Sequence, residues 1–148
     1  MLTTLLALTL LAAGPKSEAL PFDLPALKAQ PRVTVKVIEK GQSVTYSGVP
    51  LARLIKAQLS GPNLMADLRT LSDAAILLKS KDDYVAVVSA VEAGLDDKGE
   101  KYLIAFERDG KPLTEEQGPA MLVIPGETMR VRWVRMIASA SLIHIGTP

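Results

Sequence analysis

The 148-residue chain contains no cysteine, and aromatic residues make up only 4% of it. The absence of cysteine excludes disulfides, thiolate metal ligands, cysteine nucleophiles and the C-x-x-C-H attachment site of haem. With so few aromatic side chains, the core must be built mainly from Leu, Val, Ile and Ala. The formal net charge of +1 gives no global attraction for nucleic acid. Glycine-rich phosphate-binding motifs are also missing, so the sequence does not support nucleotide binding.

The chain begins with an apolar run over residues 2–13 that contains only threonine as a polar residue. The run is shorter than the roughly 20 residues that span a bilayer, and it suits the core of a signal peptide. A small-x-small tripeptide ends at Ala19, so we expect residues 1–19 to be removed and the mature chain to begin at Leu20. The expected location is the periplasm or the cell exterior. No basic residue precedes the run, and an uncleaved anchor stays an alternative.

The mature chain reads as one strand-rich domain over residues 33–148, after an extended, proline-containing lead-in over residues 20–32. Alternating polarity and short apolar runs predict its strands. The expected strands cover residues 33–38, 43–46, 74–80, 84–88, 102–107 and 121–124, with a strand-rich end from 129 to 145. Asp109-Gly110 is the strongest hairpin signal. Because short turns join most strands, the predicted class is α+β, a mixed β-sheet with a few short helices.

Three short helices are predicted among these strands. Residues 47–51 are expected to open the first helix, because proline is tolerated in the first helical turn. Its apolar stripe at helical spacing consists of Leu51, Leu54, Ile55 and Leu59. Asn63 is expected to cap a second helix over residues 64–68, and Ser89 a third over residues 90–94.

Several short motifs follow one another along this domain. They are Tyr46-Ser47-Gly48-Val49-Pro50-Leu51, Lys79-Ser80-Lys81-Asp82-Asp83-Tyr84, Asp109-Gly110-Lys111-Pro112-Leu113, Gly118-Pro119, the apolar run over residues 122–126, and Val131-Arg132-Trp133-Val134. In this order and spacing they resemble the sulfite-oxidase-like molybdopterin-binding domain, over about residues 33–145. The resemblance implies the α+β fold of that family. It also implies oxidoreductase chemistry on a molybdenum–pterin cofactor that a cysteine thiolate holds.

The chain departs from this family where the cofactor would be held. In catalytic members a long segment with the molybdenum-ligating cysteine precedes the Gly-Val-Pro-Leu motif, and here one short hairpin takes its place. Gln117 stands where the family often has histidine, and Met121 where it usually has arginine. Arg132 keeps the basic residue before tryptophan. Since molybdenum of this class needs a soft thiolate, we assign no catalytic residue and no metal ligand.

Arg130 and Arg132 are the candidate binding residues for molybdopterin or another anionic small molecule. Alternate residues of a strand share a face, so both guanidinium groups would lie on one side and Val131 and Trp133 on the other. Arginine binds phosphate and carboxylate groups through two parallel hydrogen bonds. The alternative is that both arginines form only the solvent face of a strand and protect it from edge pairing.

The remaining ionisable residues form no recognisable site in the sequence. His144 is the only histidine, and it lacks the partners of a metal centre or a catalytic triad. We expect it at the surface or at a sheet edge. The acidic residues lack the spacing of a calcium loop. Those expected in solvated loops are Asp96, Asp97, Glu100, Glu115 and Glu116.

These observations favour an exported binding or accessory module on a molybdopterin-binding scaffold, without redox catalysis of its own. One alternative is a molybdopterin-dependent oxidoreductase, or a subunit of one, with non-thiolate metal ligation and a periplasmic or membrane redox partner. Another is a structural or protein-binding domain, because a fold does not determine a function. An exposed sheet edge and strong self-association would favour this last alternative.

Overall fold

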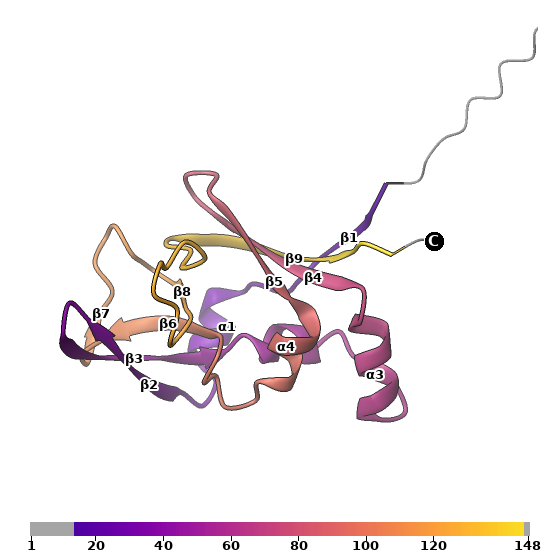
Figure 1. Ribbon diagram of the computed structural model, residues 1–148, viewed down its shortest axis with the longest axis horizontal. Helices are drawn as coiled ribbons and strands as arrows, with labels where there is room; N and C mark the ends of the chain where they lie inside the picture. The colour runs from indigo at the N-terminus through magenta and orange to yellow at the C-terminus, as the bar shows by residue number, and fades with distance from the viewer. Residues whose placement is uncertain (1–13, 147–148) are drawn as a thin grey trace, which may run out of the picture.

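The computed structural model describes residues 14–146, which form two β-sheets and four short helices (Figure 1). The four-stranded sheet has the order β1 (Lys16–Ala19), β9 (Ile137–His144), β4 (Ala74–Ser80) and β5 (Val85–Ser89). The five-stranded sheet has the order β2 (Val33–Glu39), β3 (Gln42–Pro50), β6 (Leu103–Arg108) and β7 (Lys111–Pro112), and β8 (Met121–Val123) pairs with β6. The predicted α+β class is confirmed.

The four helices of the described residues are short and flank the sheets. They are α1 (Leu24–Lys28), α2 (Ala52–Lys56), α3 (Leu64–Leu71) and α4 (Ala90–Leu95). Helix α4 contacts the strands β4 and β5 and the helices α2 and α3, whereas α1 contacts β3. None of these helices has the length and apolar character that crossing a membrane requires. The apolar run over residues 2–13, predicted as the core of a signal peptide, lies outside the described residues.

Every strand pair within residues 14–146 is antiparallel, so two antiparallel sheets replace the single mixed sheet expected from the sequence. The short turns explain this, because antiparallel strands can be joined by tight hairpins and parallel strands need long crossovers. The hairpin predicted at Asp109-Gly110 is confirmed, since these residues connect β6 to β7. Both have positive φ, at 49° and 75°, as a type I′ turn requires.

One cluster of buried apolar side chains joins the two sheets into a single core. The four-stranded sheet contributes Ile76 and Leu78, and the five-stranded sheet contributes Val49, Leu103 and Ile104, all without measurable exposure. The core is mainly aliphatic, as the composition predicts.

The structure contradicts the helix predicted to open at residues 47–51. Strand β3 continues to Pro50, and α2 begins only at Ala52. The reason is that β3 pairs with β6 along this stretch, with a bulge between Ser47 and Gly48. Tertiary pairing here overrides the local signal, which is weak because proline suits both a first helical turn and the end of a strand.

Gly48 occupies a position that no other residue can fill without moving the backbone. A Cβ atom there would collide with the carbonyl oxygen of Ile104 and lie 2.7 Å from the Cα atom of Ala105. Both of those residues belong to the neighbouring strand β6. Glycine is therefore required where the bulge brings the two backbones together.

The caps predicted for two helices are confirmed. The Asn63 side chain accepts a hydrogen bond from the backbone N–H of Ala66 at 3.0 Å, at the start of α3. The Ser89 hydroxyl accepts one from the N–H of Glu92 at 3.3 Å, at the start of α4. These caps satisfy N–H groups that have no partner inside the helix, so they could be read from local sequence alone.

The N-terminal segment is more ordered than the predicted lead-in. Residues 20–32 include helix α1 and are therefore not extended throughout. Strand β1 pairs with β9, and the N–H of Leu20 donates to the carbonyl of Ala140 at 2.9 Å. Because β1 precedes the predicted cleavage site after Ala19, removal of residues 1–19 would also remove this strand and expose the outer edge of β9.

Residues 124–136 form an irregular loop, here called the 124–136 loop, instead of the strand predicted from residue 129. Arg130 and Met136 have φ values of 51° and 47°, which no regular strand contains. The loop is held by backbone hydrogen bonds, including Leu122 N–H to the Val134 carbonyl at 2.8 Å and Met136 N–H to the Gln117 carbonyl at 2.9 Å. Strand β9 begins only after these residues.

Candidate functional site

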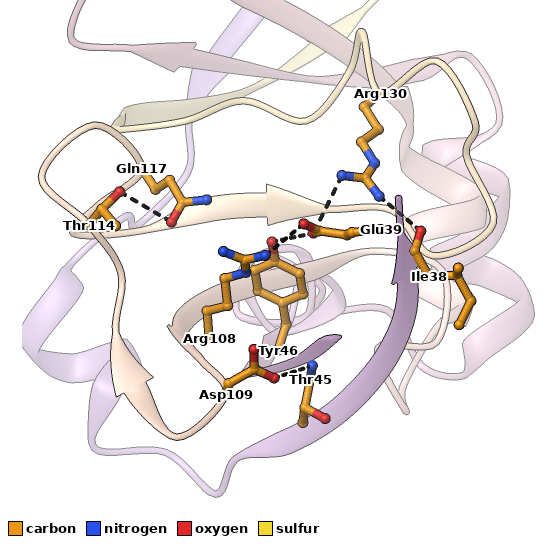
Figure 2. A network of polar contacts seen from close by, with 9 residues as sticks. All are labelled: Ile38, Glu39, Thr45, Tyr46, Arg108, Asp109, Thr114, Gln117 and Arg130. Carbon is orange, nitrogen blue, oxygen red and sulfur yellow. Dashed lines mark hydrogen bonds and ion pairs between the residues drawn. The ribbon is translucent and has the colours of Figure 1, made fainter. Parts of the chain in front are cut away.

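Arg130 lies where the 124–136 loop meets the hairpin of β2 and β3 (Figure 2). One Nη atom of its guanidinium donates to the carbonyl of Ile38 at 3.1 Å, and the other lies 3.4 Å from a carboxylate oxygen of Glu39. The guanidinium also lies over the ring of Trp133, 4.5 Å from the ring centroid. Its left-handed backbone and these three contacts hold the side chain in one position, although 35% of it stays exposed.

Glu39 is the centre of a polar network at the end of β2 (Figure 2). Its carboxylate accepts hydrogen bonds from the Tyr46 hydroxyl at 2.6 Å and from an Nη atom of Arg108 at 2.9 Å, and it also faces Arg130. Only 15% of the Glu39 side chain is exposed. Two guanidinium groups thus surround one carboxylate, which leaves an excess positive charge around a half-buried centre.

Tyr46 is the aromatic residue of this network. Its ring meets that of Trp133 edge to face, with centroids 5.9 Å apart and an interplanar angle of 84°. Burial, followed by the hydrogen bond to Glu39 and the negative charge of that carboxylate, raises the pKa of Tyr46 to about 12. The phenol therefore stays protonated and donates to Glu39 at any physiological pH.

A cleft of about 650 Å³ lies on the outer side of Arg130 and is here called the cationic cleft. Its lining residues are Lys36, Val37, Ile38, Lys40, Gly126, Glu127, Thr128, Arg130 and Trp133. Three of them are cations and one is a carboxylate. Since Lys36 and Lys40 are exposed on β2 and its turn, the potential in the cleft favours an anion.

A smaller hollow of about 120 Å³ lies on the inner side of the same arginine. It is lined by Glu39, Tyr46, Gln117, Met121, Arg130, Trp133 and Arg135. Gln117 and Met121 are the positions at which the chain departs from the molybdopterin-binding pattern. Arg130 and Trp133 line both spaces, so these two side chains form the wall between the hollow and the cationic cleft.

The structure separates Arg132 from Arg130, which were predicted to share one face of a strand. Both Nε and an Nη atom of Arg132 lie 2.6 Å from one carboxylate oxygen of Glu127, and this hydrogen bond raises the pKa of Arg132. Arg132 does not line the cationic cleft. Its positive charge compensates that of Glu127, the single carboxylate among the lining residues. The strand that the solvent-face alternative assumed does not form either, because both residues lie in a loop.

The second oxygen of the Glu127 carboxylate, Oε2, is buried and has no hydrogen-bond partner among the described residues. A buried acceptor without a donor is unfavourable by about 1–3 kcal/mol. Glu127 lines the cationic cleft, but this oxygen is itself buried and does not face the open space.

The other ionisable residues singled out in the sequence have local structural contacts. His144 lies on β9 with its Nδ1 atom 3.2 Å from a carboxylate oxygen of Asp73. The Asp96 carboxylate accepts backbone hydrogen bonds from Glu100, Lys101 and Tyr102 at 2.8–3.0 Å, which close the loop before β6. Within residues 14–146, no group of three His, Cys, Asp or Glu side chains is placed to hold a metal ion.

The sequence did not indicate that Lys36, Glu39 and Lys40 belong to the site, nor the role of Trp133. Alternation along β2 places Lys36 on the solvent face, but it does not show that a loop 90 residues later covers the end of that strand. The position of Arg130, three residues before the only tryptophan, was the single usable signal. No family model matches the chain, and no curated protein matches its sequence.

Proposed function

We propose that this protein is a binding module that takes an anionic small molecule in the cationic cleft, without redox catalysis of its own. The observation that supports this proposal most directly is the fixed position of the Arg130 side chain. Its contacts to Ile38, Glu39 and Trp133 hold the guanidinium at the cleft wall and leave donors for a ligand. A preorganised guanidinium loses less conformational freedom on binding than a mobile one, which favours affinity.

The charges and size of the cleft support this class of ligand. Lys36 and Lys40 add two ammonium groups to the Arg130 guanidinium, and Arg132 compensates Glu127. A volume of about 650 Å³ falls within the range of small-molecule sites, which is roughly 300–1,000 Å³. The cleft therefore suits a small ligand that carries an anionic group.

A pterin with a phosphate or carboxylate group fits this description in part. The three cations of the cleft suit the anionic group. The molybdenum of the cofactor does not fit, because its protein ligand in the resembling family is a thiolate and the sequence has no cysteine. We therefore propose pterin as a ligand class and derive no oxo-transfer step.

Two further parts of the proposal concern origin and location. We propose that the scaffold is a short form of the sulfite-oxidase-like molybdopterin-binding domain, supported by the order of its motifs. We also propose export to the periplasm, where a redox partner would be available, supported by the apolar run over residues 2–13. N-terminal sequencing of protein from a periplasmic extract tests export, and an intact Met1 in the cytoplasmic fraction would contradict it.

The ligand proposal is tested by titrating the purified protein with inorganic phosphate, citrate and pterin-6-carboxylate while recording the fluorescence of Trp133. Because Trp133 is the only tryptophan and lines the cleft, a bound anion changes its emission. We expect saturable binding of at least one probe and a loss of about tenfold in affinity for Arg130→Gln, which is about 1.4 kcal/mol.

Two variants serve as controls for this titration. Arg69→Gln removes the same charge from the exposed surface of α3, and it should leave the affinity unchanged. Arg132→Gln should weaken binding less than Arg130→Gln, because it acts only by leaving Glu127 uncompensated. No saturable binding of any probe, or equal affinities for Arg130→Gln and Arg69→Gln, would overturn the proposed function.

A further inference from the structure

The inner hollow beside Glu39 differs from the cationic cleft in its size and in its walls. Its volume is about 120 Å³, which is about four times the roughly 30 Å³ that one water molecule takes up in the liquid. Three of its lining residues, Tyr46, Met121 and Trp133, are buried. The local dielectric is low beside such groups, so a charge in the hollow interacts more strongly than it would in water.

Arg135 supplies a cation that lines the hollow and does not line the cationic cleft. Within residues 14–146 its exposed side chain forms no ion pair, whereas Arg108 and Arg130 both do. The carboxylates that line a neighbouring hollow together with Arg135 are those of Asp82, Glu115 and Glu116. Because none of them forms an ion pair with Arg135, its guanidinium donors remain available to a ligand.

Gln117 adds a neutral donor on the same hollow. Its side-chain oxygen accepts a hydrogen bond from the Thr114 hydroxyl at 3.2 Å, and the amide nitrogen lies on the side away from Thr114 (Figure 2). The backbone N–H of Met136 donates to the Gln117 carbonyl at 2.9 Å, which holds the segment of Arg135 beside that of Gln117. One charged and one neutral donor thus meet at one space.

Positive charge exceeds negative charge around the hollow. Glu39 is the single carboxylate among its lining residues, and Arg108 and Arg130 already share that carboxylate. Arg108 does not line the hollow, but its charge is close by, and its buried Nε atom has no partner among the described residues. Together with Arg135, three guanidinium groups therefore stand against one carboxylate, which favours an anion.

We propose that the inner hollow is a second anion site, which takes a small oxyanion such as inorganic phosphate. Arg135 and Gln117 are its direct donors, and Arg130 adds charge from the wall that the hollow shares with the cationic cleft. The volume admits a group of about five heavy atoms and is too small for a ring ligand, whose sites span roughly 300–1,000 Å³. The inference does not depend on the proposed function, because Arg135 and Gln117 lie outside the cleft.

The test is isothermal titration of inorganic phosphate into the full purified protein after the cationic cleft has been saturated with citrate, which is larger than the hollow can hold. We expect phosphate to bind saturably below about 10 mM, and Arg135→Gln to lower its affinity at least tenfold. Gln117→Leu, which removes the neutral donor, should weaken binding less. If citrate itself does not bind, the same phosphate titration without citrate decides. No saturable phosphate binding, or an unchanged affinity in folded Arg135→Gln, would overturn the proposal.

Two control variants separate the hollow from the cleft, which Arg130 variants cannot do because Arg130 lines both. Lys40→Gln, at a residue that lines the cleft alone, should weaken citrate binding and leave phosphate binding unchanged. Arg69→Gln removes an exposed charge from α3 and should change neither affinity. If Lys40→Gln left citrate binding unchanged while phosphate still required Arg135, only the function proposed for the cleft would fail. Equal losses of phosphate affinity in Arg135→Gln and Arg69→Gln would contradict a site in the hollow.

Discussion

The two sheets of this protein differ in how deeply their charged side chains are buried. In the five-stranded sheet, Glu39 is 15% exposed and contacts Tyr46, Arg108 and Arg130. In the four-stranded sheet the ion pairs, such as that of Lys16 with Glu18, lie on the surface, where they contribute little. The comparison shows that the five-stranded sheet has a largely buried charge network, whereas the ion pairs of the four-stranded sheet are exposed.

The largest expected effect on stability comes from a substitution between β3 and β6 of the five-stranded sheet. Gly48→Ala should lower the free energy of unfolding by about 3 kcal/mol, because the added Cβ collides with the backbone of Ile104. Urea denaturation measures this change. Gly110→Ala is the matched control: it lies at φ 75° with no atom within 4 Å of the added Cβ, and it should be less destabilising, by about 1 kcal/mol. Equal losses for the two variants would contradict the close approach at Gly48.

A smaller effect tests whether the buried charge distinguishes the two sheets. Glu39→Gln removes the carboxylate between two arginines and should lower the free energy of unfolding by about 2 kcal/mol. The same change should raise the affinity for anions, because Arg130 loses its competing carboxylate. Asp83→Asn, which neutralises the exposed pair with Lys79 at the four-stranded sheet, should change neither quantity measurably. Weaker anion binding by folded Glu39→Gln would show that Glu39 has a different role in the site.

The smallest effect is a pH dependence that belongs to the five-stranded sheet alone. The pKa of Tyr46 is raised from 10.0 to about 12, so the folded state retains its proton longer than the unfolded chain. The resulting stability is present below about pH 10 and is lost as the pH rises towards about 12. The pKa of Tyr102 is also raised, by burial and by its hydrogen bond to Glu92, so tyrosinate absorbance should show two late-titrating groups, of which Tyr46→Phe removes one. An unchanged number of late-titrating groups in Tyr46→Phe would contradict the burial of the phenol beside Glu39.

Local signals in the sequence predicted those parts of the fold that local interactions form. The strand over residues 74–80, the hairpin at Asp109-Gly110 and the helix caps at Asn63 and Ser89 are confirmed. Each depends on side chains that bond or bury within a few residues of their own position. The first helix forms as α2, but its predicted start at residues 47–51 was wrong, because this stretch pairs with β6, which lies more than 50 residues away in the chain.

The candidate site could be predicted only in part. The sequence indicated Arg130 as a binding residue, and this remains a prediction. The regular strand that was expected to align it with Arg132 does not exist, because the 124–136 loop follows backbone bonds to Gln117 and β8 instead of a ladder. Glu39 and Lys40 carried no signal, since a charge beside a hairpin turn is typical of any surface.

The sequence by itself determined the α+β class, most strand positions and the lack of a thiolate for a metal, because composition, alternation and capping act over short distances. Only the tertiary structure decided that Arg130 stacks on Trp133 at the end of β2, and that Arg132 pairs with Glu127 instead. These features depend on contacts between segments far apart in the chain, and their geometry is defined only when both sheets have formed around one core.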